Sequence, residues 1–90
     1  MSRFRAGQDA LAATLPDGAV LLNLRTNRYH SLNETGTRVW QLLIEGKSED
    51  EIVETMTSEY HVAEPVAREE TRAVIMALKA QELIVETTDQ

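Results

Sequence analysis

The stretch GAVLLNLRTNRYHSLN, residues 18–33, decides how this chain folds. Residues 19–24 are nearly all apolar, which is typical of the central strand of a small sheet that is flanked on both sides. Residues 25–28 then form a tight turn, in which Asn27 tolerates the left-handed backbone conformation better than most residues. Residues 29–32 follow as a short strand, so the stretch predicts a β-hairpin.

A further strand is predicted immediately before this hairpin. Leu11, Ala13 and Leu15 alternate with smaller or more polar neighbours, which is the period of a strand with one buried face. The sequence PDG at residues 16–18 is a turn signal, because proline presets φ and glycine supplies a positive φ. Two successive hairpins give a three-stranded antiparallel meander, whose third strand is predicted to leave a free edge.

The remainder of the chain has the pattern of helices. Asn33 is a good N-cap for a helix that carries Trp40 among aliphatic residues, where core packing is favoured. Residues 48–51, SEDE, form a capping box for a second helix, and Pro65 suits the first turn of a third. Residues 83–85, LIV, form a short apolar tail, either as an added strand or as a wing.

The order of elements is three strands followed by three helices, with no repeats and no long linker. This order predicts one α+β domain over residues 1–90, with its core at about residues 9–86. A three-stranded antiparallel sheet followed by three helices also suggests a winged helix-turn-helix-like architecture. The last helix should bury the face formed by Ala67, Thr71, Val74, Ile75 and Leu78.

Composition narrows the classes of function. The 90 residues include 15 acidic and 9 basic ones, for a net charge of −6, and this balance argues against nucleic-acid binding. There is no cysteine, so the chain has no disulfide, no thiol nucleophile and no zinc ribbon. No apolar run is long enough to span a bilayer, and the opening residues, MSRFRAG, lack the pattern of a signal peptide. We therefore expect a small acidic protein of the cytoplasm that binds no membrane.

Catalysis finds little support in the sequence. His30 and His61 are far apart, and neither lies at a metal-ligand spacing. There is no glycine-rich phosphate loop and no nucleophile elbow. The acidic run at residues 49–51 is better explained as the first turn of a helix than as a cation site, because carboxylates complement the helix dipole there. We expect no catalytic residue, no metal and no cofactor.

DNA binding is the function that the topology alone suggests. The helix that would enter the major groove carries three basic and three acidic residues: Arg68, Glu69, Glu70, Arg72, Lys79 and Glu82. These charges cancel, whereas a recognition helix usually brings net positive charge to the phosphates. The charge pattern therefore disfavours a role for this helix in DNA recognition.

The free edge of the third strand is the feature that remains. A peptide could add there as a fourth strand, with backbone hydrogen bonds for affinity and side-chain pockets for specificity. The last helix would form one wall of the groove with a stripe that consists of Val66, Glu69, Glu70, Ala73 and Ala77. The two alanines would leave room for side chains of the peptide, and the two glutamates could pair with its basic residues. The alternative is an ordinary solvated helix face. Tyr29, on the edge strand, either packs on the helices or presents its ring to a partner.

The sequences GAVLLNL at residues 18–24 and RYHSLN at residues 28–33 resemble the strand–turn–strand signature of the PqqD-like family. Gly36, the pair VW at residues 39–40 and the pair IV at residues 52–53 continue the resemblance, which extends over nearly the whole chain. The chain is most similar to the stand-alone leader-recognition proteins of lasso-peptide clusters. These are RiPP recognition elements, where RiPPs are ribosomally made and post-translationally modified peptides.

The resemblance implies a winged helix-turn-helix-like fold of three strands and three helices that has no catalysis of its own. It also implies that the leader region of a precursor peptide adds as a β-strand to strand three, against the last helix. Carried over position by position, this site consists of Arg28, Tyr29, His30, Ser31, Leu32, Val66, Glu70, Ala73, Val74 and Ala77. The sequence departs from the commoner family pattern at His30, where a second aromatic often stands, and at Glu82, where glycine is frequent.

The resemblance also implies partners. In lasso systems such a protein delivers the precursor to a cysteine-protease-like leader peptidase, and the matured core goes to an ATP-dependent cyclase. We therefore expect the leader peptide and the peptidase as partners, with the cyclase open as a further one. Three alternatives remain: a DNA-binding winged-helix regulator, a recognition element of another pathway such as that of pyrroloquinoline quinone, and a module whose free edge pairs with its own copy. Monomer and strand-exchanged dimer are both open.

Overall fold

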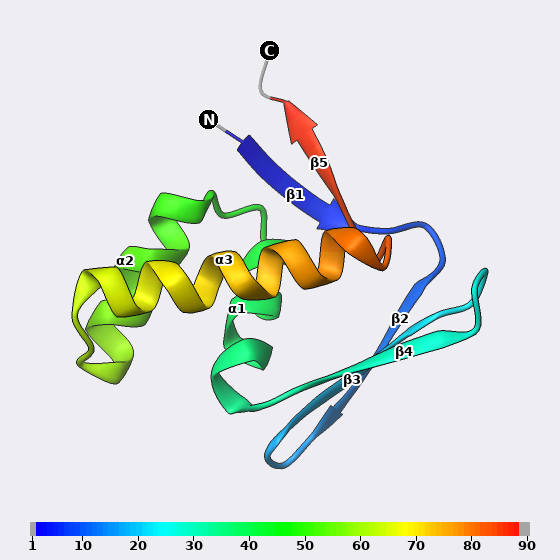
Figure 1. Ribbon diagram of the computed structural model, residues 1–90, viewed down its shortest axis with the longest axis horizontal. Coiled ribbons are helices and arrows are strands. Elements are labelled where there is room, and N and C mark those ends of the chain that lie inside the picture. Colours follow the sequence, from blue (N-terminus) through cyan, green and yellow to red (C-terminus); the bar gives the residue numbers. More distant parts are fainter. Residues whose placement is uncertain (1, 89–90) are drawn as a thin grey trace.

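The structure, a computed structural model, describes residues 2–88 and contains the predicted three-stranded sheet followed by three helices (Figure 1). The strands of this sheet are β2 (Ala10–Leu15), β3 (Gly18–Asn23) and β4 (Arg28–Leu32), and the helices are α1 (Glu34–Ile44), α2 (Glu49–Tyr60) and α3 (Glu64–Ala80). All pairings are antiparallel, in the order β2-β3-β4. The predicted α+β, winged-helix-like fold is confirmed, with β4 at an edge of the sheet.

A second, two-stranded sheet joins the two ends of the described chain. It pairs β1 (Ser2–Ala6) with β5 (Ile84–Thr88) in antiparallel register. The apolar tail therefore forms the added strand that the sequence suggested, but its partner β1 was not predicted. Phe4 is the one large apolar side chain of β1 and is buried in the core. A single apolar residue gives no recognisable period, so only the distant pairing with β5 makes this segment a strand.

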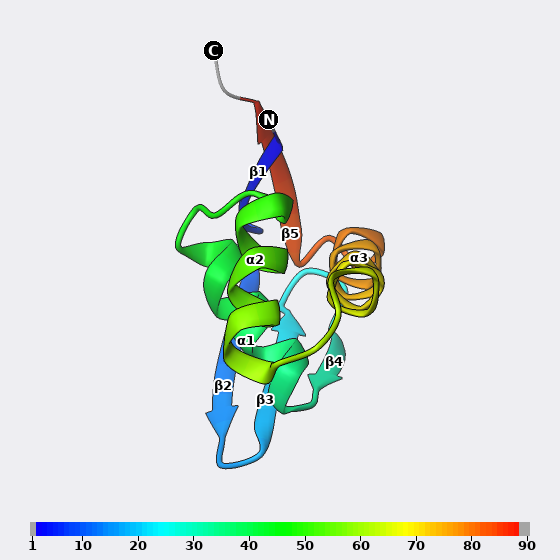
Figure 2. The same ribbon diagram turned by 90° about the vertical axis from the view of Figure 1, so that its left-hand side faces the viewer.

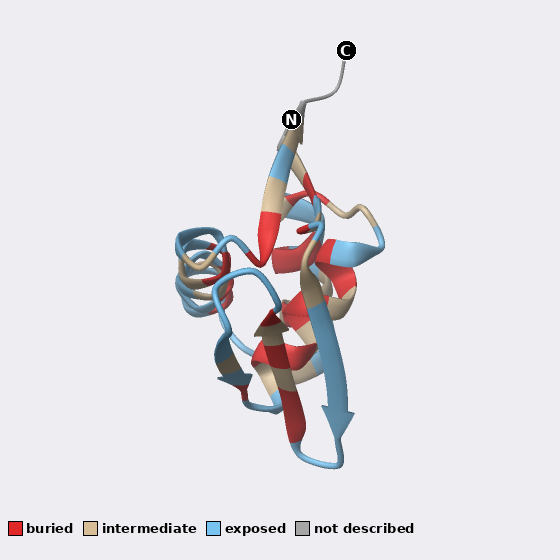
Figure 3. Cartoon of the chain, turned by 90° about the vertical axis from the view of Figure 1, so that its right-hand side faces the viewer, coloured by how far each residue is buried: buried red, intermediate tan, exposed pale blue. Residues whose placement is uncertain are grey.

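The prediction of a buried face on β2 is wrong. Leu11, Ala13 and Leu15 are all exposed, and so are the residues that alternate with them (Figure 3). The helices explain the difference, because α1 packs against β3 and β4 whereas the main contacts of β2 are with β3. β2 thus extends the sheet beyond the area that the helices cover.

The core lies between β3, the three helices and the small sheet. The three helices lie on one side of the three-stranded sheet, with α3 on the side of β4 (Figure 2). Leu21 of β3 is completely buried, as are Leu43 of α1, Ile52 of α2 and Leu78 of α3. Trp40 is buried in the same cluster, as predicted. No helix within residues 2–88 is long and apolar enough to cross a membrane.

The helix ends follow the predicted caps. Asn33 accepts a hydrogen bond from the Gly36 amide at 2.8 Å and so caps α1. Ser48 and Glu51 form a reciprocal capping box at the start of α2, where the Ser48 amide donates to Glu51 Oε1 at 2.8 Å. Arg3 of β1 also donates to that oxygen, at 2.8 Å. The Glu51 carboxylate therefore connects the start of α2 to the small sheet.

The capping carboxylate predicts a pH dependence of stability. Hydrogen bonds from the Ser48 backbone and then from Arg3 hold the pKa of Glu51 below its usual value of 4.5. Because the pKa is depressed in the folded state, this contribution is present above pH 4.5 and is lost as the pH falls through the folded pKa. We expect Glu51→Gln to lower the free energy of unfolding at pH 7, with the difference from wild type shrinking towards pH 3, as measured by urea denaturation. Equal differences at the two pH values would contradict this assignment.

Candidate functional site

The edge strand β4 and the helix α3 form the two walls of a groove. Within the described part of the chain, β4 pairs only with β3, so alternate residues of β4 direct their backbone N–H and C=O groups away from the sheet. A buried side chain positions the helix: Asn23 Nδ2 at the end of β3 donates to the Gln81 carbonyl at 2.9 Å. Asn23 Oδ1 also accepts from the amides of Arg25 and Thr26, so one residue fixes both the β3–β4 turn and the end of α3.

The groove between these walls is shallow and largely apolar, with a volume of about 340 Å³. Small residues leave this space open, since Gly36 of α1 and Ala73 and Ala77 of α3 are all part of its lining. Its lining consists of His30, Ser31, Leu32, Asn33, Gly36, Ala73, Val74 and Ala77. Such a space suits one or two bulky side chains of a bound segment.

Two hydrogen bonds lie near the ends of the groove, one between α1 and α3 and the other between the C-cap residue of α3 and β4. At one end, Thr35 Oγ1 donates to Glu70 Oε1 at 2.5 Å. At the other, Gln81 Nε2 lies 3.1 Å from His30 Nδ1, and donates to it when the ring proton is on Nε2. The eleven residue steps from position 70 to position 81 correspond to about 16 Å along a helix, which is the length of about five residues of extended chain. The groove therefore has the length of a short β-strand.

The structure brings six of the predicted site residues together in this groove: His30, Ser31, Leu32, Ala73, Val74 and Ala77. The sequence reasoning about the site missed Asn33, Gly36 and Gln81. Asn33 and Gly36 were recognised as a cap and as part of the family signature, but only the contact of α1 with β4 places them in the groove. Val74 contributes both to the groove and to the core.

The other predicted site residues lie outside this lining. Tyr29 is opposite Leu22 on the face of the sheet away from the helices, where it is 70% exposed, so it presents its ring to solvent. Arg28 is exposed at the turn end of β4. On α3, Val66 is exposed near the start of the helix. Glu69 lies on a different face of α3, beside Arg68, Arg72, Ala73 and Met76.

The bases of α3 are engaged within the molecule. Arg68 forms ion pairs with Glu49 and Asp50 of α2, at 2.9 and 3.0 Å. Arg72 pairs with Glu49 at 2.8 Å, and Lys79 pairs with Glu86 of β5 at 3.2 Å. The acidic run at the start of α2 thus stabilises the N-terminus of that helix and forms ion pairs that connect α2 to α3. No group of three or more histidine, aspartate or glutamate side chains within residues 2–88 could hold a metal ion.

The sheet, the helices and the groove define a small winged-helix-like domain with an open strand edge beside its last helix. Residues 18–84 match the family profile described as PqqD, coenzyme PQQ synthesis protein D, which covers most of the chain. The chain belongs to the PqqD family, as its resemblance indicated. A comparison with the curated proteins finds no match.

Two solved structures agree closely with the whole molecule. One is TbiB1 in complex with the TbiA(beta) leader peptide, which is 35% identical, with a TM-score of 0.84 over 94% of this chain and 99% of that chain. The other is lasso peptide synthetase B1 complexed with the leader peptide, which is 30% identical, with a TM-score of 0.83 over 92% of this chain and 98% of that one. Both of these relatives were therefore solved with a leader peptide bound.

A third solved structure shares only the fold. It is the heterocyclase TruD, of which this chain matches 12%, with 16% identity and a TM-score of 0.68 over the full length of this chain. At this identity the likeness extends to the arrangement of strands and helices and not to function.

Proposed function

We propose that this protein is a non-catalytic adaptor that binds the leader region of a ribosomally made precursor peptide, in the maturation of a lasso peptide. The observation that carries the proposal is the open groove between β4 and α3, in a chain that is 35% identical to a protein solved with its leader peptide. The leader adds to β4 as a further antiparallel or parallel strand, with α3 covering one of its faces.

The chemistry of the groove fits strand addition. The outward backbone groups of β4 supply hydrogen bonds that do not depend on the sequence of the peptide. The space beside Gly36, Ala73 and Ala77 takes apolar side chains that project towards the helices, and so supplies the specificity. The rim residue Glu70 accepts a hydrogen bond from Thr35, and its remaining oxygen is available to a basic residue of the leader.

The adaptor acts by raising the local concentration of the precursor peptide at its processing enzyme. The adaptor holds the leader and also docks on the cysteine-protease-like leader peptidase. The peptidase then meets its substrate within one complex, as an intramolecular event. The ATP-dependent cyclase then acts on the released core. The proposal assigns no bond-making or bond-breaking step to the residues of this chain.

An NMR titration of the ¹⁵N-labelled protein with the leader encoded by the neighbouring precursor gene tests the proposal. We expect saturable amide shifts concentrated in residues 28–32 and in residues 73–81, since these form the walls of the groove. A peptide of the same composition in scrambled order serves as the control and should cause no saturable shifts. Absence of shifts at millimolar leader, or saturable shifts confined to other elements, would reject leader binding in this groove.

The charge distribution gives no support to the DNA-binding alternative. Arg68, Arg72 and Lys79 all form ion pairs with carboxylates of α2 and β5, so α3 presents no uncompensated positive charge. The net charge of −6 adds long-range repulsion from phosphates.

A further inference from the structure

The opposite edge of the same sheet is also open. Within residues 2–88, β2 pairs only with β3. Its sequence, ALAATL, has no charge, no proline and no glycine, and Leu11 and Leu15 are 56% and 51% exposed. Proteins usually protect an edge strand with charges, proline or a bulge, because unpaired backbone groups pair readily with another chain. An uncharged, exposed edge strand therefore indicates that a partner covers β2.

The register of the sheet shows what such a partner would meet on each face. Ala12 and Thr14 are opposite the buried residues Leu21 and Ala19 of β3, so they lie on the side of the helices. Leu11 and Leu15 lie on the other side, and both are exposed. A strand added to β2 would place alternate side chains next to these leucines and the others above the space beside α1.

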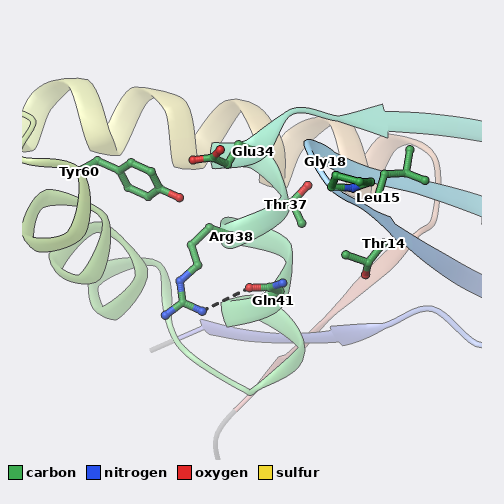
Figure 4. A pocket seen from close by; sticks show the side chains of 9 residues that line it. Thr14, Leu15, Gly18, Glu34, Thr37, Arg38, Gln41 and Tyr60 are labelled. Carbon is green, nitrogen blue, oxygen red and sulfur yellow. Dashed lines mark hydrogen bonds between the residues drawn. The ribbon is translucent and has the colours of Figure 1, made fainter.

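That space is a pocket of about 220 Å³ between the β2–β3 turn, α1 and the end of α2 (Figure 4). It is several times the roughly 30 Å³ that one water occupies in the liquid, and so it admits a long side chain. Figure 4 shows Tyr60 extending towards Glu34 and Arg38 on one side, with Thr14 and Leu15 on the other. The pocket therefore opens beside the unpaired strand.

The charge of the pocket is negative. The only base in its lining, Arg38, is neutralised by Glu59, to which its Nε and Nη2 atoms donate at 2.8 Å each. Glu34 also lines the pocket, is exposed, and has no ion-pair partner within residues 2–88. In agreement with this charge, burial and then the carboxylates of Glu34 and Glu59 raise the pKa of Tyr60 above its usual value. A lysine or arginine side chain is complementary to this site.

We propose that β2 and this pocket form a second strand-addition site, which binds an extended segment of the leader-processing enzyme and takes one of its lysine or arginine side chains beside Glu34. The inference rests on the proposed function, because the enzyme that receives the leader supplies the segment. A second copy of this chain fits less well, since its own β2 contains no basic residue to place beside Glu34.

The position of this site explains how one small domain can hold two partners. β2 and β4 are separated only by β3, which corresponds to about 10 Å between the two edge strands. The leader and the enzyme segment would then extend one continuous sheet at its two edges. Each edge has its own pocket on the helix side, walled by α3 at β4 and by α1 at β2.

Calorimetric titrations of the purified leader peptidase and of the leader peptide, performed separately, test this inference. We expect Glu34→Lys to weaken peptidase binding by at least about tenfold, because it replaces an attractive charge in the pocket with a repulsive one. The affinity for the leader should stay within about twofold of wild type, which also shows that the variant is folded. Glu54→Lys makes the same charge change at an exposed position of α2, outside the pocket, and should leave both affinities unchanged.

The other outcomes separate this inference from the proposed function. Peptidase binding that is equal in Glu34→Lys and wild type would overturn the second site while the leader groove stands. Leader binding without any peptidase binding to the wild-type protein would overturn the delivery step and the second site together. A dimer in sedimentation at tens of micromolar that Leu11→Lys dissociates would show that a second copy covers β2, and would overturn the assignment to the enzyme.

Discussion

Replacing Ala77 with tryptophan should weaken binding of the leader peptide by at least about 100-fold, which corresponds to about 2.7 kcal/mol. Ala77 lines the helix wall of the groove, where its small side chain leaves space facing β4. An indole at this position fills the volume that the side chains of an added strand need, while α3 itself tolerates the change because Ala77 is only half-buried. Calorimetric titration with the leader measures the effect, and circular dichroism monitors the fold.

Met76→Trp is the matched control. Met76 precedes Ala77 in the same helix but is 69% exposed and lies outside the groove lining. The same bulky residue there should leave leader affinity within about twofold of wild type. Equal affinities of folded Ala77→Trp and wild type would locate leader binding away from the groove, and equal losses in both variants would indicate a general effect on α3.

Gly18→Ala should lower the free energy of unfolding by about 2–3 kcal/mol, a large share of the roughly 5–13 kcal/mol expected for a domain of this size. A Cβ on Gly18 would overlap the Leu32 carbonyl oxygen and lie 3.2 Å from its carbonyl carbon. Both atoms belong to the backbone of β4, so a rotamer change cannot relieve the overlap. The first strand of the hairpin must instead move away from the edge strand that carries the groove.

Gly46→Ala separates this steric effect from the loss of a glycine as such. Gly46 has a φ of 88° after the end of α1, and an added Cβ there meets nothing within 4 Å. Its replacement should cost only about 1 kcal/mol, from the left-handed backbone alone. Urea denaturation measures both variants. A cost for Gly18→Ala no greater than that for Gly46→Ala would show that the β3–β4 contact relaxes freely.

The local signals in the sequence predicted the fold well where they were self-contained. The apolar run before Asn27, the cap at Asn33 and the box at residues 48–51 each specify an element through neighbours in the chain, and each is present. The alternation of Leu11 and Leu15 led to the wrong prediction that one face of β2 is buried. A period of two indicates a strand, but it does not indicate whether another element covers that strand. β1 was missed for the opposite reason, since its partner is about eighty residues away.

The candidate site was predictable in part. The order of strands in a meander makes the third strand an edge, and the spacing of Ala73 and Ala77 places both on one face of a helix. Where that helix lies depends on contacts between distant residues. The hydrogen bond from Asn23 to the Gln81 carbonyl holds the end of α3 beside the hairpin, and no local pattern in the sequence indicates it.

The sequence by itself therefore determined the strands of the meander, the three helices, their caps and the open edge at β4, because these depend on residues within a few positions of one another. The tertiary structure alone decided which faces are covered. In the tertiary structure no helix buries either face of β2, and Tyr29 lies on the face of the sheet away from the groove. Gly36 and Gln81 lie at the groove. The physical reason is that burial depends on the relative placement of whole elements, which is fixed by packing and hydrogen bonds between residues tens of positions apart.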